Sequence, residues 1–317
     1  MDLRGLDLNL LVVLDALFAE RHVTKAGDRI HLSQSATSSA LARLRDYFQD
    51  ELLVQNGRRM MLTPYAEGLV QPVRDLLMRA ESLAQHHSAF NPATLTRTFV
   101  LKMSDYVASI LMPRIIPTVR ALAPGVTLDI RSNYFGAVES LERGDVDLLI
   151  MPQQFLSKHH PSEVLFDDGY LCVVWVGNEH VGQSLTLAKY LSLGHAAVQY
   201  ADMQMPVLEE WFSTHIGKRR RIEVLSMAFT LLPHLIVGTD LIATMHARLA
   251  RKFEKTLPLR LLPAPVEMPR LVEGVQWHTH KALDPAIRWM RSLLAQAVAP
   301  RRNAKVSHPL QKDESRR

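Results

Sequence analysis

The sequence contains one cysteine in 317 residues and no long apolar run. A single cysteine excludes a secreted scaffold held by disulfides and indicates a reducing compartment. No segment reaches the roughly 18 apolar residues that a membrane-spanning helix needs. The chain also carries Asp2, Arg4 and Asp7 where a signal peptide would begin its apolar segment. We therefore expect a cytoplasmic protein with no membrane partner.

The signatures of enzymes and metal proteins are also missing. The sequence has no Gly-rich phosphate loop, nucleophile elbow or acid/base pair with a supporting motif. Histidine pairs occur at 86/87, 159/160 and 278/280, but neither cysteine nor carboxylate stands beside them at a recognisable ligand spacing. We expect no enzyme, no metal and no cofactor.

What is present is a globular composition with unevenly placed charge. Hydrophobic residues make up 47% of the chain and charged residues 22%. A chain of this length exceeds one compact core, so we expect two domains. The net charge is +5, yet residues 1–63 carry eight basic and eight acidic side chains. Most of the excess lies in residues 300–317, a basic tail that we expect to be disordered.

The first 63 residues have the periodicity of short helices. Apolar residues recur at spacings of three and four between positions 10 and 17, and Asp7 can cap that helix. Thr24 can cap a second helix, and Ser33 can cap a third that runs to about residue 47. The third helix is expected to turn these residues inward: Ala36, Ala40, Leu41 and Leu44.

The outward face of the third helix is polar and free of acid. From Arg29 to Arg45 the chain has three arginines and no Asp or Glu. Glutamine can bond the edge of adenine, and serine can bond bases or phosphates. The outward residues are Gln34, Ser35, Ser38, Ser39, Ala42 and Arg45. This face indicates either a helix that reads a DNA groove or an ordinary solvated surface.

A long helix is expected after residue 63. Thr63 can cap it, and Pro64 fits its first position. Apolar residues then alternate at spacings of three and four, as in the seam of a short coiled coil: Ala66, Leu69, Val73, Leu76, Ala80 and Leu83. The seam favours a dimer whose two copies read two half-sites roughly one helical turn apart. The alternative is a helix packed on its own domain.

From residue 92 the chain alternates strands with helices, which predicts a parallel sheet built from βαβ units. Strands are expected at 99–103 and 126–131 and from residues 147, 171, 195, 222 and 241. Helices are expected at 106–122, 135–143, 209–215 and 284–299. Cys172 lies in an apolar strand and is expected to be buried and inert. The basic run 218–221 is interpreted as a solvated loop, with contact to DNA or a partner as the alternative.

Several motifs together resemble one family of bacterial regulators. The landmarks LDLNLL, LSQSATSSAL, LxRLR and TPYAEGL occur in order within residues 6–69, and LERGDVDLLI follows at 141–150. They resemble the LysR-type transcriptional regulators, in the branch of the nodulation (NodD) and the salicylate- and aromatic-catabolism regulators. The resemblance covers almost the whole chain.

The resemblance implies an α+β and α/β multidomain fold. A winged helix-turn-helix DNA-binding domain would occupy residues 1–63, a linker helix that dimerises antiparallel with its partner residues 64–91, and an effector-binding domain residues 92–299. The last would resemble a periplasmic binding protein, with one α/β subdomain at about 92–160 and 266–299 and another at 161–265.

The resemblance also implies which residues bind DNA. Residues 34–39 would enter the major groove, whereas Arg43 and the wing arginines would lie near phosphates. The DNA-binding candidates are Thr24, Ser33, Gln34, Ser35, Thr37, Ser38, Ser39, Arg43, Arg58 and Arg59.

In such a fold a small molecule binds in the crevice where strands end and helices begin. The effector-binding candidates at these ends are Ser104, Asp105, Tyr106, Asn133, Tyr134, Phe135, Tyr200, Phe229, Thr230, Met245, His246, Trp277 and His278. Their aromatic and hydroxyl groups suit a flat phenolic or flavonoid-like inducer, although each aromatic residue could instead belong to a core. A carboxylate ligand would need a cation, and this set offers only His246 and His278.

Together these features predict a sequence-specific transcriptional regulator, an activator that responds to an aromatic or phenolic inducer. Its expected partners are double-stranded DNA with inverted-repeat half-sites, further copies of itself in a dimer and tetramer, and RNA polymerase. The alternative is a solute-binding or catalytic α/β module with an appended helical domain. The missing export signal and catalytic residues disfavour that alternative.

Overall fold

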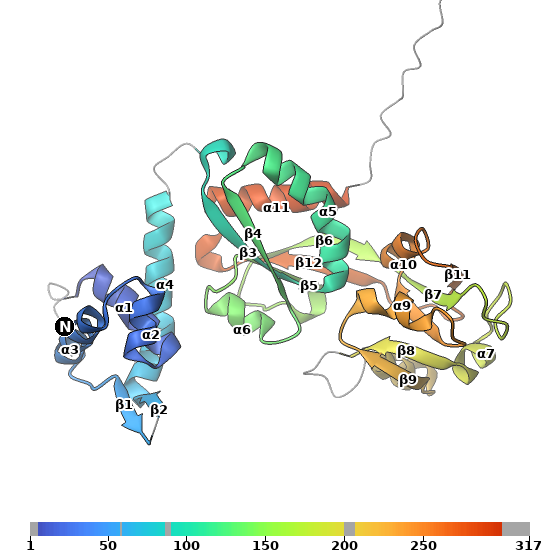
Figure 1. Ribbon diagram of the computed structural model, residues 1–317, viewed down its shortest axis with the longest axis horizontal. Coiled ribbons are helices and arrows are strands. Elements are labelled where there is room, and N and C mark those ends of the chain that lie inside the picture. Colours follow the sequence, from blue (N-terminus) through green and yellow to red (C-terminus); the bar gives the residue numbers. More distant parts are fainter. Residues whose placement is uncertain (1–5, 58, 86–89, 200–206, 300–317) are drawn as a thin grey trace, which may run out of the picture.

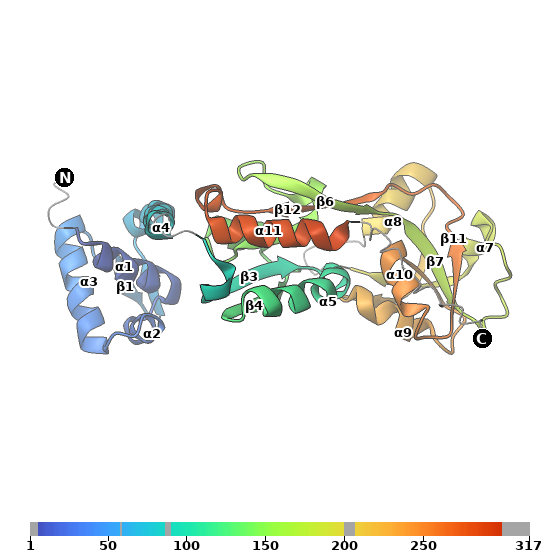
Figure 2. The same ribbon diagram turned by 90° about the horizontal axis from the view of Figure 1, so that it is seen from above.

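The computed structural model describes residues 6–57, 59–85, 90–199 and 207–299. They form a helical N-terminal domain, the long helix α4 and a larger C-terminal domain (Figure 1). Figure 2 shows these parts in a row, with α4 between the N-terminal helices and the C-terminal domain. Within the described residues, no helix is both long and apolar enough to span a membrane. The predicted disordered tail, 300–317, lies outside them.

The N-terminal domain packs three helices beside a two-stranded antiparallel wing. Its elements are α1 (Leu8–Glu20), α2 (Val23–Arg29), α3 (Gln34–Phe48), β1 (Leu53–Asn56) and β2 (Arg59–Leu62). Two predicted caps are confirmed, because Asp7 accepts from the Asn9 amide at 2.8 Å and Ser33 accepts from the Ala36 amide at 3.2 Å. The predicted cap at Thr24 is wrong. Helix α2 begins at Val23, and the residue before it, His22, makes no side-chain hydrogen bond that caps the helix.

The inward stripe of α3 differs from the prediction at one position. Thr37 is fully buried and Ala36 is exposed. The Thr37 hydroxyl donates to the carbonyl oxygen of Ser33 at 3.0 Å, so its burial leaves no polar group unsatisfied. A Cβ at Gly27 would lie 2.6 Å from this hydroxyl, so α2 and α3 can approach closely only because position 27 is glycine.

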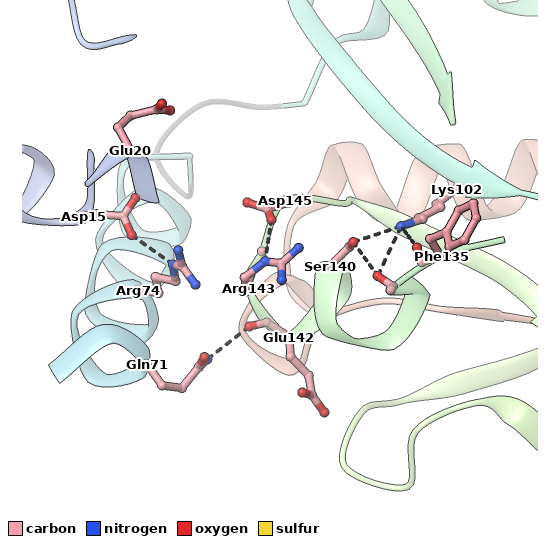
Figure 3. A network of polar contacts seen from close by, with 12 residues as sticks. Asp15, Glu20, Gln71, Arg74, Lys102, Phe135, Ser140, Glu142, Arg143 and Asp145 are labelled. Atoms are coloured by element: carbon pink, nitrogen blue, oxygen red, sulfur yellow. Dashed lines mark hydrogen bonds and ion pairs between the residues drawn. The ribbon is translucent and has the colours of Figure 1, made fainter. Parts of the chain in front are cut away.

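Helix α4 (Pro64–Gln85) begins as predicted, with the Thr63 hydroxyl accepting from the Ala66 amide at 3.0 Å. The first half of the predicted seam packs on its own domain, because Ala66 and Val73 are buried in the core that α1 and α3 share. Arg74 adds a bond of 2.9 Å to Asp15 of α1 (Figure 3). Leu76, further along the seam, is 45% exposed.

The C-terminal domain contains two five-stranded sheets. The first has the order β4-β3-β5-β12-β6 and comprises β3 (Arg97–Met103), β4 (Val126–Ser132), β5 (Leu148–Pro152), β6 (Ser162–Asp168) and β12 (Leu271–Gln276). The second has the order β11-β7-β10-β8-β9 and comprises β7 (Tyr170–Trp175), β8 (Gly194–Val198), β9 (Arg221–Ser226), β10 (Ile242–His246) and β11 (Leu259–Pro263).

The sheets are mixed, so the prediction of parallel sheet is confirmed for some strand pairs and wrong for others. Strand β3 runs parallel to β4 and β5, and β8 runs parallel to β9 and β10. The exceptions lie where the chain passes between sheets: β12 is antiparallel to β5 and β6, and β7 is antiparallel to β10 and β11. The chain leaves the first sheet at Gly169, later than the expected 160, and returns through residues 264–270.

Helices cover both sheets (Figure 1). One apolar core runs through both subdomains. The α-helices are α5 (Asp105–Leu122), α6 (Ala137–Glu142), α7 (Leu187–Ser192), α8 (Val207–Trp211), α9 (Leu232–Ile236), α10 (Ala247–Phe253) and α11 (Pro285–Val298). The short turns are 3₁₀ helices η2 (Pro92–Thr94), η3 (Gln153–Phe155), η5 (Phe229–Leu231) and η6 (Thr279–Lys281) and the π-helical turn η4 (Phe212–Ile216). The helix expected at 209–215 is thus divided between α8 and η4.

Of the predictions for Cys172 and for the basic run 218–221, the first is confirmed and the second is wrong at Arg220. Cys172 is fully buried as predicted, and burial raises the pKa of its thiol to about 12. Arg220, in the run interpreted as a solvated loop, is instead buried against Glu209 and donates to the Tyr190 hydroxyl at 3.1 Å. Because its charge is paired with a buried carboxylate, Arg220 is a core residue.

Candidate DNA-binding surface and ligand cavity

The exposed face of α3 carries short polar side chains. Gln34, Ser35, Ser38 and Ser39 all lie on the surface, and Arg43 is exposed one turn further on. Short side chains allow a helix to approach base edges closely, and an arginine beside them can reach a phosphate. Two candidates lie elsewhere. Thr24 is exposed on α2, and buried Thr37 has no surface to offer to DNA.

The wing follows α3 and is fixed to it by an arginine. Arg45 donates to the carbonyl oxygens of Glu51 at 2.8 Å and Leu53 at 2.9 Å, so it holds the wing in place. Gly57 has a φ of +61° at the tip of the hairpin. Of the two predicted wing arginines, Arg58 lies outside the described residues, and the structure describes the backbone of Arg59 in β2 but not its side chain.

A cavity of about 830 Å³ opens between the two subdomains. Its walls come from the start of α5, the end of β10, the turn η5 and the two segments where the chain crosses between the sheets. Four effector-binding candidates line it: Ser104, Tyr106, Phe229 and His246. A cavity of this size at strand ends and between subdomains has the dimensions of a small-molecule site.

Aromatic rings surround His246 on one side of this cavity. Its imidazole stacks on Tyr106 with centroids 4.3 Å apart and lies 5.0 Å from the rings of both Tyr170 and Phe229. Burial lowers the pKa of His246 to about 4, so the ring is neutral at pH 7. Its Nδ1 is buried without a hydrogen-bond partner among the described residues.

The arginines of the lining are both paired with carboxylates. Arg220 is paired with Glu209, and Arg270 donates to Asp167 at 2.6 Å. The described lining contains no lysine. Glu273 is buried, and its Oε2 has no hydrogen-bond partner among the described residues. Burial raises its pKa to about 8, so its carboxyl is mostly protonated at pH 7. The cavity therefore offers no free cation among its described residues to bind an anionic ligand.

Three further candidates form a clasp beside the cavity. The Asp105 carboxylate, at the start of α5, accepts from the amides of Phe229 at 3.2 Å and Thr230 at 2.7 Å. It also accepts from the hydroxyls of Thr230 and Tyr134, each at 2.6 Å. Because α5 and η5 belong to different subdomains, these bonds tie the two halves together next to the ligand cavity.

The remaining candidates do not line the cavity. Asn133 donates to the carbonyl oxygen of Ile150 at 3.3 Å, and Met245 is buried in the core. Phe135 is exposed, and the guanidinium of Arg291 covers the ring of Trp277 at 3.3 Å. Tyr200 lies outside the described residues. The criterion of lying at a strand end thus picked out residues around the whole sheet as well as residues that line the cavity.

Sequence reasoning missed lining residues on the crossing segments, notably Tyr170 and Glu273. Tyr170 was missed because the first crossing was expected near residue 160, and Glu273 was missed because no strand was expected at β12. A signal was present at one position: Glu273 is the lone acid in the apolar segment LVEGV. A charged residue inside a buried strand requires a partner or a function.

His278 belongs to a second pocket, of about 440 Å³, between α4 and the C-terminal domain. There the imidazoles of His160 and His278 lie 4.4 Å apart, and His280 lies 3.8 Å from Asp75 of α4. Burial lowers the pKa of His278 to about 4. Among the residues that the structure describes, no group of three His, Cys, Asp or Glu is arranged to hold a metal ion.

Figure 3 shows the rest of this contact between α4 and α6. The side chain of Gln71 donates to the carbonyl oxygen of Glu142 at 3.0 Å. Behind α6, the buried Lys102 donates to the Phe135 carbonyl oxygen at 2.7 Å and to the Ser140 hydroxyl at 2.9 Å. The hydrogen bonds of Lys102 thus hold α6 in place where it contacts α4.

The N-terminal domain is a winged helix-turn-helix with a polar face on α3. One helix joins it to a C-terminal domain that has a cavity between two subdomains. This arrangement defines a ligand-responsive DNA-binding regulator. Comparisons with known proteins agree. Residues 8–67 match the model for the bacterial regulatory helix-turn-helix protein, lysR family, and residues 92–299 match the LysR substrate binding domain. The chain therefore belongs to the LysR family of DNA-binding transcriptional regulators. Members of this family are not enzymes, which sets aside the alternative of a catalytic module.

The chain is similar to nodulation proteins and to a probable transcriptional regulator of known structure. The chain is 42% identical over 313 residues to Nodulation protein D 2 of Rhizobium tropici, covering 98% of this chain and 99% of that protein. It is 43% identical over 299 residues to Nodulation protein D of Bradyrhizobium sp. (strain ANU 289), covering 94% and 88%. A solved probable transcriptional regulator from Pseudomonas aeruginosa is 32% identical with a TM-score of 0.65, covering 93% of this chain and 98% of that one.

Proposed function

We propose that this regulator activates transcription in response to a neutral aromatic inducer, of phenolic or flavonoid-like type, bound between the two subdomains. The cavity carries this proposal. Its lining combines the aromatic rings of Tyr106, Tyr170 and Phe229 with neutral His246, and its arginines are already paired. Flat rings would stack on such walls, whereas a carboxylate would find no free cation in the described lining.

We further propose that the chain acts as a dimer of dimers on inverted-repeat half-sites in the cytoplasm. Exposed Leu76 on α4, beyond the half of the seam that its own domain covers, supports pairing through the linker helix. Each recognition helix contributes only a short polar face, so two copies on two half-sites add their contacts. Effector domains then join two dimers, and the inducer changes the bending of DNA and the contact with RNA polymerase. Such coupling requires that the inducer bind the two arrangements with different affinity.

The DNA contacts are assigned to the exposed candidates. Gln34, Ser35, Ser38 and Ser39 face bases or phosphates from α3, and Ser33 holds the start of that helix. Arg43, Arg58 and Arg59 complete the set near the phosphates, with Thr24 on the neighbouring helix. Gln34 and Ser38 lie four residues apart and therefore share one side of α3.

Replacing Gln34 and Ser38 together with alanine tests the assignment. We expect the double variant to lose promoter-specific footprints and inducer-dependent transcription with purified RNA polymerase, while its oligomeric state remains unchanged, because both side chains are exposed. The matched control replaces Gln296 and Ser292, the same residue types at the same spacing on the exposed face of α11. Retained footprints in the α3 variant would reject the assignment.

A further inference from the structure

Glu273 differs from the other buried carboxylates in the described part of the chain, because its Oε2 has no hydrogen-bond partner there. Its side chain belongs to β12, is 3% exposed and lines the cavity between the subdomains. By contrast, Asp147 bonds Arg97 at 2.9 Å, Asp168 accepts from the Tyr106 hydroxyl at 2.7 Å, and Asp284 bonds Arg97 at 2.6 Å.

An unpaired buried carboxyl reduces the stability of the fold unless something else bonds it. Structural roles do not account for Glu273, because the arginines of the same lining are occupied elsewhere: Arg220 bonds Glu209 and Arg270 bonds Asp167. The register of β12 against β6 also shifts between Glu273 and Gly274, a bulge at the residue that faces the cavity. Bulges commonly redirect a side chain toward a site.

We propose that Glu273 is the specificity-determining residue of the effector cavity, where its protonated carboxyl donates a hydrogen bond to a carbonyl or hydroxyl oxygen of a neutral aromatic effector and excludes carboxylate ligands. The inference rests on the proposed function, since it assumes that this cavity binds the effector. A protonated carboxyl offers one O–H donor and a carbonyl acceptor, which match an uncharged oxygen. A second carboxylate beside it would meet repulsion and no free cation.

The groups around Glu273 allow its protonation to be followed separately. Tyr106 of α5, Tyr170 of β7 and His246 of β10 surround the same cavity. Glu210 of α8, His215 of η4 and Arg220 also line it, and Asp168 of β6 and Arg270 of the return segment lie at its edge. Burial raises the pKa of Tyr170 to about 12 and lowers that of His246 to about 4, so neither ring changes charge between about pH 7 and pH 9. Burial raises the pKa of Glu273 to about 8, within that interval.

The test measures binding of flavone, which has one carbonyl oxygen and no titratable group, to the full-length wild-type protein by calorimetry. We expect flavone affinity to fall about tenfold between about pH 7 and pH 9, as Glu273 loses the proton it donates. Flavone-8-carboxylate should bind at least about tenfold more weakly than flavone at pH 7.

Two variants and one control separate the possible results. Glu273→Gln, which keeps a donor without an ionisable group, should bind flavone independently of pH, and Glu273→Leu should bind it weakly at every pH. Glu254→Gln removes an exposed glutamate outside the cavity lining and should behave as wild type. Because the wild-type pH profile is itself a readout, the test does not depend on the variants folding.

If wild type and Glu273→Gln share one pH profile, or the carboxylate binds as well as flavone, the proposal for Glu273 is overturned while the effector cavity stands. If wild type binds neither probe, the proposed inducer class fails and this proposal fails with it.

Discussion

The two junctions of this chain are built differently. The subdomains of the effector domain share one continuous apolar core, to which α5 contributes Leu111 and α10 contributes Leu249, both fully buried. The junction between α4 and the effector domain instead depends on a few mostly polar contacts, such as that of Gln71 with the Glu142 carbonyl oxygen (Figure 3). Met78 of α4 adds one apolar contact, against Gly144.

This difference assigns distinct tasks to the two junctions. Burying one leucine contributes about 1.5–3 kcal/mol, whereas an exposed polar pair contributes at most about 1 kcal/mol. The core between the subdomains therefore keeps the ligand cavity in shape, and the contact with α4 can change its geometry at little cost. We expect an inducer bound at the first junction to be sensed at DNA through the second.

The largest predicted effect breaks the apolar junction. Leu111→Ala removes a fully buried side chain of α5 from the core that the two subdomains share. We expect the free energy of unfolding of the effector domain to fall by about 2–5 kcal/mol in urea titrations, with the helix-turn-helix domain unaffected. Leu122→Ala, which truncates an exposed leucine of the same helix, should change it by less than about 0.5 kcal/mol. Equal losses for the two variants would contradict the model of one continuous core.

A smaller effect is predicted where α6 meets α4. Gly144 has a φ of +75°, and a Cβ there would lie 2.7 Å from the Met78 sulfur. Gly144→Ala should therefore destabilise the effector domain by about 1–2 kcal/mol through backbone strain, which urea titrations measure, while the flexible Met78 side chain moves to relieve the contact. Adding Met78→Ala removes the contact and should restore none of the lost stability. Restored stability in the double variant would show that the contact with Met78, and not backbone strain, causes the loss.

The sequence predicted those parts of the fold that depend on local chemistry. Caps such as Asp7 and Ser33 need only neighbouring residues to be recognised. The positions of the crossing strands could not be predicted in the same way, because β12 pairs with β6 and β5 across more than a hundred residues. Non-local pairing also explains the antiparallel strands that the alternation of elements did not indicate.

The same limit applies to the candidate sites. Ser104, Tyr106, Phe229 and His246 were found because strand ends and helix starts gather at the crevice of an α/β fold. His278 satisfied the same rule, yet it lies at the contact with α4, because η6 faces that helix instead of the cavity. Only the arrangement of the crossings distinguishes the two places, and it brings Tyr170 and Glu273 into the site.

The smallest predicted effect concerns the polar junction alone. Gln71→Ala and Asp75→Ala together remove the side-chain contacts of α4 to the Glu142 carbonyl oxygen and to His280, which lies 3.8 Å from Asp75. Because these groups are largely solvated, we expect the free energy of unfolding to change by less than about 1 kcal/mol. Flavone affinity should be unchanged, whereas the change in DNA affinity that flavone causes should shrink, because the ligand-dependent geometry reaches α4 through these contacts. A loss of stability as large as that of Leu111→Ala would show that the two junctions are equally rigid, and an undiminished DNA response would show that the signal reaches α4 by another route.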